Sequence, residues 1–183
     1  MRKLSDFFRK YSPGWVVLAS LPIFVVYSLM TLPAESARAE EYSQGLGSPD
    51  TTLFYDSQTL VEMAENYGEE GRLAYVQARW GFDLAFPIVY TLFYLTSISY
   101  FFKNPKSWRL NLLPLGGLAF DLAENTAASV VMSVYPRQGT WSEWLAPIFT
   151  PVKWFFVATC MLLVGIGLVI WVRTKILALI RHT

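Results

Sequence analysis

The stretch WFFVATCMLLVGIGLVIWV, from Trp154 to Val172, decides the fold class because it contains no charged residue. A helix needs ~20 mostly apolar residues to cross a hydrocarbon core of ~30 Å. Three further apolar stretches of similar length lie upstream. We therefore expect an all-α integral membrane protein with four transmembrane helices, at residues 15–32, 82–102, 110–134 and 147–172 of one domain, 1–183.

The composition supports this class and excludes several chemistries. The chain has 183 residues, of which 54% are hydrophobic and 16% aromatic, more than in an ordinary soluble domain. Cys160 and His182 are the single cysteine and the single histidine, so we expect no haem, no zinc site and no Ser-His-Asp catalysis. No other cofactor is evident. No basic, aromatic-rich surface points to nucleic acid as a partner.

The basic residues gather on one side of the four expected spans. They precede the first span, fill the connection between the second and third, and follow the fourth, whereas the opposite side holds most of the acids. The positive-inside rule then places both termini in the cytoplasm, with the plasma (cytoplasmic) membrane as the expected location. The residues on the cytoplasmic side are Arg2, Lys3, Arg9, Lys10, Lys103, Lys106, Arg109, Arg173, Lys175 and Arg181.

A cleaved signal peptide is the alternative interpretation of the first apolar stretch. A basic start, an apolar run and the sequence ARA at Ala37–Ala39 resemble a secretory signal and its cleavage site. The apolar run is longer than a usual signal core, which favours a retained span.

Residues 33–81 are expected to form a small helical extracytoplasmic cap between the first two spans. Residues 33–50 are small, polar and turn-forming, which predicts an exposed linker. Asp56 or the serine after it is suited to begin a short helix. A second helical pattern starts near Glu69 and is expected to run without interruption into the second span. The apolar stripe of the first cap helix is Leu60, Met63 and Tyr67.

A polar face follows the helix that enters the second span. Its residues recur at spacings of three or four, so they project from one side. Pro87 has no N–H and crowds the carbonyl four residues earlier, so we expect a free backbone acceptor at Asp83; a kink that only improves packing is the alternative. The residues of this face are Arg72, Tyr75, Arg79, Asp83, Phe86 and Tyr90.

The third span, within GGLAFDLAENTAASVV at 116–131, carries two acids and an amide on one side: Asp121, Glu124 and Asn125. Each acid at a helix centre costs about 2.5–3.5 kcal/mol on the insertion scale. These side chains must therefore face the bundle interior. Lys153 lies about 9 Å below the outer surface, so we predict that it pairs with Glu124, with Asp121 wholly or partly protonated.

Three functions remain open on this pattern. The favoured one is a non-catalytic accessory or interaction protein, in which the polar network fixes the helices and another membrane protein is a partner. The second is an outward-facing pocket for a lipid or isoprenoid-like molecule. The third, proton or ion transport, is less favoured because polar residues thin out toward the cytoplasmic side.

The pocket hypothesis gives each residue a role. Arg72, Tyr75 and Arg79 would meet an anionic head group, and membrane lipids would be the partners. In an enzymatic variant, Glu124 or Asp121 would be the general acid or base, although no recognisable catalytic motif accompanies them. The apolar slot would be lined by Phe86, Tyr90, Phe93 and Trp154. The full candidate site is Arg72, Tyr75, Arg79, Asp83, Tyr90, Asp121, Glu124, Asn125 and Lys153.

Overall fold

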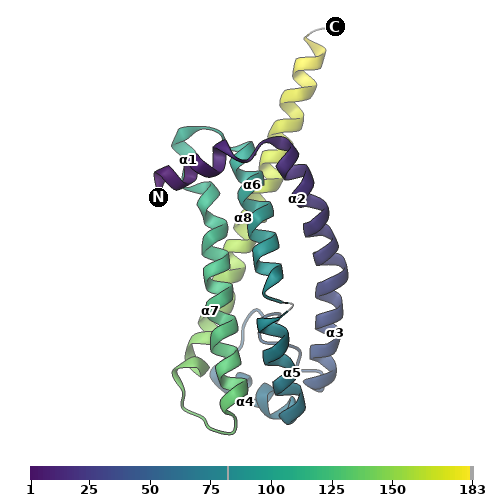
Figure 1. Cartoon of the computed structure of the whole chain (residues 1–183), viewed down its shortest axis with the longest axis vertical. Helices are drawn as coiled ribbons and strands as arrows, with labels where there is room; N and C mark the ends of the chain where they lie inside the picture. The colour runs from purple at the N-terminus through teal and green to yellow at the C-terminus, as the bar shows by residue number, and fades with distance from the viewer. Residues whose placement is uncertain (82, 182–183) are drawn as a thin grey trace.

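A computed structural model describes residues 1–81 and 83–181 of the chain. Over these residues all regular structure is helical and no strand occurs, as the sequence predicts. The helices pack as an elongated bundle, with α1 and the C-terminal end of α8 at the same end (Figure 1). In chain order they are α1 (Arg2–Lys10), α2 (Gly14–Val26), η1 (Tyr27–Thr31), α3 (Leu32–Tyr42), α4 (Ser57–Asn66), α5 (Gly68–Trp80), α6 (Ala85–Phe101), η2 (Pro105–Ser107), η3 (Leu110–Leu112), α7 (Leu113–Val134) and α8 (Trp141–Ile180).

Three helical stretches of the described chain are long and apolar enough to cross a membrane: Gly14–Tyr42, Gly68–Phe101 and Trp141–Ile180. The α7 helix, at the predicted third span, is not among them. Asp121, Glu124 and several small residues lower its hydropathy. It nevertheless belongs to the bundle, because α5, α6 and α8 all pack against it.

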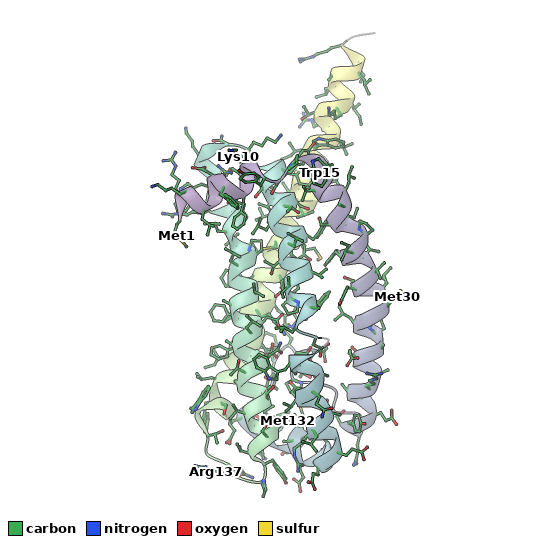
Figure 2. The ribbon with its side chains drawn as sticks, viewed as in Figure 1. Met1, Lys10, Trp15, Met30, Met132 and Arg137 are labelled. Carbon is green, nitrogen blue, oxygen red and sulfur yellow. The ribbon has the colours of Figure 1, made fainter. Side chains whose placement is uncertain are left out.

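The first long helix extends beyond its predicted end. Residues 33–42 were expected to be linker, but they continue the helix as α3, so that prediction is wrong over this range. The turn between α2 and α3 is π-helical, and the Leu32 N–H bonds to the Tyr27 carbonyl. Pro33 explains the wide turn, because a proline lacks an N–H and crowds the carbonyl four residues before it. Met30 points away from the bundle here (Figure 2).

A break separates α5 from α6, where the sequence pattern predicted one uninterrupted helix. The backbone leaves the helical region at Gly81, with φ −101° and ψ −101°. A Cβ there would lie 2.8 Å from the Gln77 carbonyl oxygen, so only glycine fits. The Asp83 carbonyl is also not free as predicted, because it accepts the Phe86 N–H at 3.3 Å. The break ends α5 at the level where Arg79 and Asp83 meet the rest of the bundle.

Residues 43–67 fold back against the bundle rather than standing apart from it. Asp56 is the N-cap of α4 and accepts the Thr59 N–H at 2.8 Å, as predicted. Leu60 and Met63 are fully buried and pack with Met132 of α7 in one apolar cluster. This packing places the start of α4 beside the preceding loop, which carries Ser48 and Asp50 and lies against the bundle.

The opposite end of the bundle is closed by α1. Ser5 donates to Asn111 Oδ1 at 2.7 Å, and the Asn111 amide donates to the Ser5 carbonyl at 3.1 Å and to Ser99 Oγ at 2.9 Å. These buried bonds fix α1 across the ends of α6 and α7 (Figure 1). The buried polar residues around Arg79 and Lys153 are here called the polar centre. A second apolar cluster lies between this end and the polar centre; its members are Tyr90, Phe93, Tyr94, Ile98 and Cys160.

Candidate functional site

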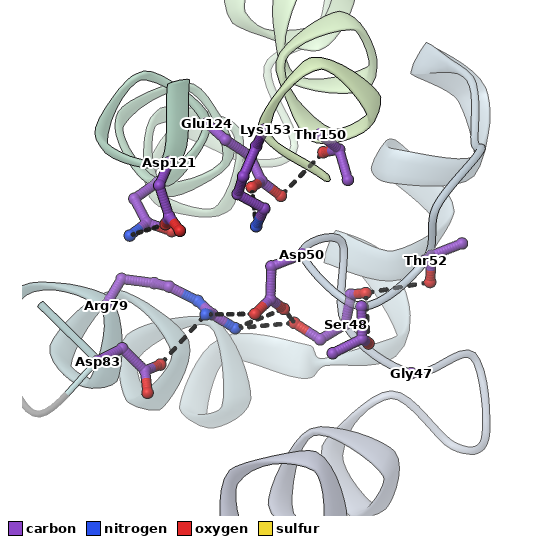
Figure 3. Close-up of polar contacts among 12 residues, drawn as sticks. Gly47, Ser48, Asp50, Thr52, Arg79, Asp83, Asp121, Glu124, Thr150 and Lys153 are labelled. Carbon is purple, nitrogen blue, oxygen red and sulfur yellow. Dashed lines mark hydrogen bonds and ion pairs between the residues drawn. The ribbon is translucent and has the colours of Figure 1, made fainter. Parts of the chain in front are cut away.

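Arg79 contacts three polar residues of the polar centre, namely Ser48, Asp50 and Asp83. Its two terminal nitrogens donate to the two carboxylate oxygens of Asp50 at 2.8 and 2.9 Å, and one of them also reaches Ser48 Oγ at 2.9 Å. Arg79 also forms an ion pair with Asp83, at 3.2 Å. Arg79 thus joins the break after α5 to the loop that covers the bundle (Figure 3).

The electrostatics of Asp50 follow from these partners. Burial alone would raise its pKa, but the positive charges of Arg79 and Lys153 outweigh that effect and lower the pKa from 3.8 to about 2. The carboxylate is therefore ionised at neutral pH. The Trp154 indole N–H donates to the Asp50 carbonyl at 3.0 Å, which ties the same residue to α8.

The lowered pKa of Asp50 predicts a pH dependence of stability. Because the folded-state pKa lies below the unfolded value, this contribution is present above pH ~4 and is lost as the pH falls toward 2. The loss amounts to about 2 kcal/mol. We expect the difference in unfolding free energy between the wild type and Asp50→Asn, measured in detergent, to shrink by that amount between pH 6 and pH 2. A difference that stays constant over this range would contradict the assigned ion pair.

The predicted pair between Lys153 and Glu124 is confirmed. The two side chains form a buried ion pair, with 5% and 1% of their surface exposed. Thr150 donates to the other Glu124 oxygen at 2.8 Å, and the Tyr55 hydroxyl lies 3.1 Å from Thr150 Oγ1. Because the Thr150 proton is used on Glu124, the Tyr55 hydroxyl donates to Thr150. This chain of contacts connects α7, α8 and the loop before α4.

Asp121 points to a different neighbour from Glu124, although the two lie on the same side of α7. The Tyr90 hydroxyl donates to Asp121 Oδ2 at 3.0 Å, and the Asn125 amide donates to Oδ1 at 3.4 Å. Both acids are buried. The three residues that the sequence singled out on α7 therefore divide between two partners, Lys153 on α8 and Tyr90 on α6.

A half-enclosed cavity of about 300 Å³, here called the central cavity, lies among these groups. It ends at α7, where its lining is buried, and its rim includes the exposed residues Ser36 and Met161, so it opens on the side between α3 and α8. Its polar end is formed by Asp50, Arg79, Asp83, Asp121, Asn125 and Lys153. Its apolar end includes Phe24, Leu32, Phe86, Tyr94, Val157 and Met161.

Three predicted pocket residues lie elsewhere. Arg72 donates to the Ala64 carbonyl at 2.9 Å and stacks 4.6 Å from the centre of the Tyr135 ring, away from the central cavity. Tyr75 packs beneath the Arg79 guanidinium and lines a smaller neighbouring cavity of about 160 Å³. Phe93 stacks on Phe24 at 4.6 Å, inside the second apolar cluster. The structure therefore does not bring Arg72, Tyr75 and Phe93 to the cavity wall.

Sequence reasoning missed the groups that cover the site. Ser48 and Asp50 lie in a stretch interpreted as linker, and Tyr55 lies just before α4. The sequence SPD at 48–50 is typical of a turn, so its polar side chains carried no signal of burial. Thr150 had a weak signal, since it lies one turn before Lys153 on the same helix.

No group of three or more His, Cys, Asp or Glu side chains is placed to hold a metal ion among residues 1–81 and 83–181. Comparison of the chain with protein-family models, curated proteins and solved structures found no match.

Proposed function

We propose that the chain crosses the plasma membrane four times, through α2–α3, α6, α7 and α8. Both termini then lie in the cytoplasm. The basic residues in α1, in the connection 103–109 and at the end of α8 support this orientation. In this arrangement the central cavity lies toward the outer leaflet, covered by residues 43–67. The α7 helix is too polar to enter the membrane readily by itself, but it packs against α6 and α8.

Within this frame, we propose that the protein binds an amphiphilic small molecule, such as a lipid or an isoprenoid-like compound, in the central cavity. The observation that carries the proposal is the cavity itself, with buried charged groups at its inner end and apolar side chains toward its mouth. Small-molecule sites combine an apolar wall with a few placed polar groups in this way.

The size of the cavity limits what it holds. Its volume of about 300 Å³ is at the lower end of the ~300–1,000 Å³ range of ligand pockets. It therefore fits a head group and the first part of a chain, while the remainder of the chain extends between α3 and α8 into the lipid. Access from the membrane suits a ligand that partitions into the bilayer.

A catalytic use of the same cavity would rest on Asp121 rather than Glu124. Asp121 lines the cavity, whereas Glu124 is fully buried behind Lys153 and Thr150. A carboxyl group at the end of an enclosed, apolar-walled site is suited to general acid or base chemistry. Its hydrogen-bond partners, Tyr90 and Asn125, do not by themselves define a reaction, so binding is the proposed activity.

One observation favours a second candidate, the accessory or interaction protein. Both buried cations, Arg79 and Lys153, already have acidic partners within the chain. A network of this kind is sufficient to fix the helices without any ligand. The outer faces of α2 and α8 would then contact another membrane protein. Transport gains no such support, because the second apolar cluster lies between the polar centre and the end closed by α1.

Filling the cavity separates these two candidates. Ser28→Phe places a ring at the cavity wall, and Leu29→Phe adds the same ring one residue along, where the side chain is exposed. We expect mass spectrometry of protein purified in mild detergent to find one amphiphile enriched with the wild type and with Leu29→Phe, and at least tenfold depleted with Ser28→Phe. Equal amounts on all three proteins would contradict binding in the cavity and favour the accessory protein.

A further inference from the structure

The polar end of the central cavity contains more acids than bases. Asp50, Asp83 and Asp121 line it together with two cations, Arg79 and Lys153, and Glu124 lies behind Lys153, outside the lining. Each cation is already committed, Arg79 to Asp50 and Asp83, and Lys153 to Glu124. Asp121 has only the neutral donors of Tyr90 and Asn125 as direct hydrogen-bond partners among the described residues. A further negative charge at this end of the cavity would be repelled.

The hydrogen-bonding atoms of the lining that lack partners also favour a ligand that donates hydrogen bonds over a negatively charged one. Among the described residues, the buried Asn125 Oδ1 atom accepts no hydrogen bond, and the buried Asp83 Oδ2 atom has its ion pair with Arg79 at 3.2 Å but no hydrogen bond. Both residues line the cavity, and both are more than nine-tenths buried. Such acceptors are costly unless a donor reaches them. Arg79 Nε is the one unsatisfied donor of the described lining, but its guanidinium is already neutralised by Asp50.

The walls next to these acceptors are aromatic. Phe86 and Tyr90 pack edge to face with ring centres 5.5 Å apart, and Trp154 lies across the cavity on α8. Aromatic faces attract organic ammonium groups, and the attraction grows when the cation is removed from water. A bare metal ion is a poorer fit, because the described residues offer no cluster of three metal-ligating side chains.

We propose that the ligand is an amphiphile with a positively charged amine head group, which donates hydrogen bonds to Asp83, Asp121 and Asn125. Its apolar chain leaves past Phe86 and Val157. This replaces the anionic head group expected from the sequence, because Arg79 is neutralised and Arg72 lies elsewhere. The inference rests on the proposed binding function and adds the chemical class of the ligand.

Three amphiphiles of equal chain length test whether the head group of the ligand is a positively charged amine. Octylamine, octanol and octanoate are titrated at pH 7 into the protein in phosphatidylcholine nanodiscs, with empty nanodiscs as the blank. We expect octylamine to bind at least tenfold more tightly than octanol, and octanoate to bind most weakly. Equal affinities, or a preference for octanoate, would overturn the ammonium assignment and leave the binding function standing. If none of the three binds above the blank, both fail.

Matched variants locate the head group. Asp83→Asn and Asp121→Asn each replace a carboxyl group with an amide of nearly the same shape, and Glu65→Gln does the same on the exposed surface of α4. We expect each of the first two to weaken octylamine binding at least fivefold without changing octanol binding, and Glu65→Gln to change neither. The use of two variants covers the case in which one fails to fold. Unchanged octylamine binding in every folded cavity variant would overturn the proposed position of the head group.

Discussion

Replacing Lys153 with methionine is expected to lower the free energy of unfolding by about 3–5 kcal/mol, because the change leaves the Glu124 carboxylate buried without its cation. Glu124 is buried, and Thr150 donates to only one of its two oxygens. Methionine fills nearly the same volume as lysine, so packing changes little. The measurement is equilibrium unfolding of the purified protein in mixed detergent micelles, followed by the loss of helical signal.

The double variant Lys153→Met with Glu124→Gln distinguishes a lost charge pair from a packing defect. A neutral amide still accepts from Thr150 and no longer needs the ammonium group. The double variant should therefore recover most of the stability, which gives a large coupling energy in a double-mutant cycle. Lys175→Met is the control, since it removes an exposed lysine from the same helix. A loss below about 1 kcal/mol in Lys153→Met would contradict the buried pair.

Lys153 and Glu124 also show what the sequence was able to predict. Depth in a helix follows from residue number at about 1.5 Å per residue, and a charged group in an apolar span needs a partner at a similar depth. Those two statements identified the pair without any structure. The N-cap of α4 was predictable for a similar reason, since Asp56 bonds to an amide only three residues away.

The residues that cover the site depend on non-local packing, which the sequence pattern does not encode. Asp50 contacts Arg79 because its loop folds back over the bundle, next to α4, which packs on α7 and α8. Local composition at 48–50 indicates a turn whether or not the turn is buried. The break at Gly81 was missed for another reason: the apolar and polar periodicity continues through it, and the deciding effect is a steric contact with the Gln77 carbonyl.

The two acids on α7 illustrate a third limit. Spacing placed Asp121 and Glu124 on one side of the helix, and both are buried. It did not show that one faces α8 and the other faces α6, because a difference of three residues still rotates the side chain by about 60° around the helix. This rotation separates a carboxylate with a charged partner from one with neutral partners. The central cavity lies beside Asp121, the carboxylate with neutral partners.

Replacing Arg79 with methionine is expected to have an effect as large as the loss of Lys153, because it removes the partner of the buried Asp83 and the half-buried Asp50 carboxylates. Arg79 is bidentate to Asp50 and also contacts Asp83, and its own side chain is 10% exposed. We expect a loss of about 3–5 kcal/mol in unfolding free energy. Arg79→Lys keeps the charge but not the planar fork, so it should lie between the wild type and methionine.

The same substitution should also release the loop that covers the central cavity. Without the guanidinium, the bond from Trp154 is the one hydrogen bond to the bundle that Ser48 and Asp50 keep among the described residues. Amide exchange at residues 47–52 should therefore quicken at least tenfold. Arg38→Met is the matched control, because Arg38 forms an exposed pair with Glu35 at 3.2 Å whose contribution is at most about 1 kcal/mol. Exchange that stays slow in Arg79→Met would mean that the packing of α4 alone holds the loop, and the cavity would then keep its cover without any ionic contact.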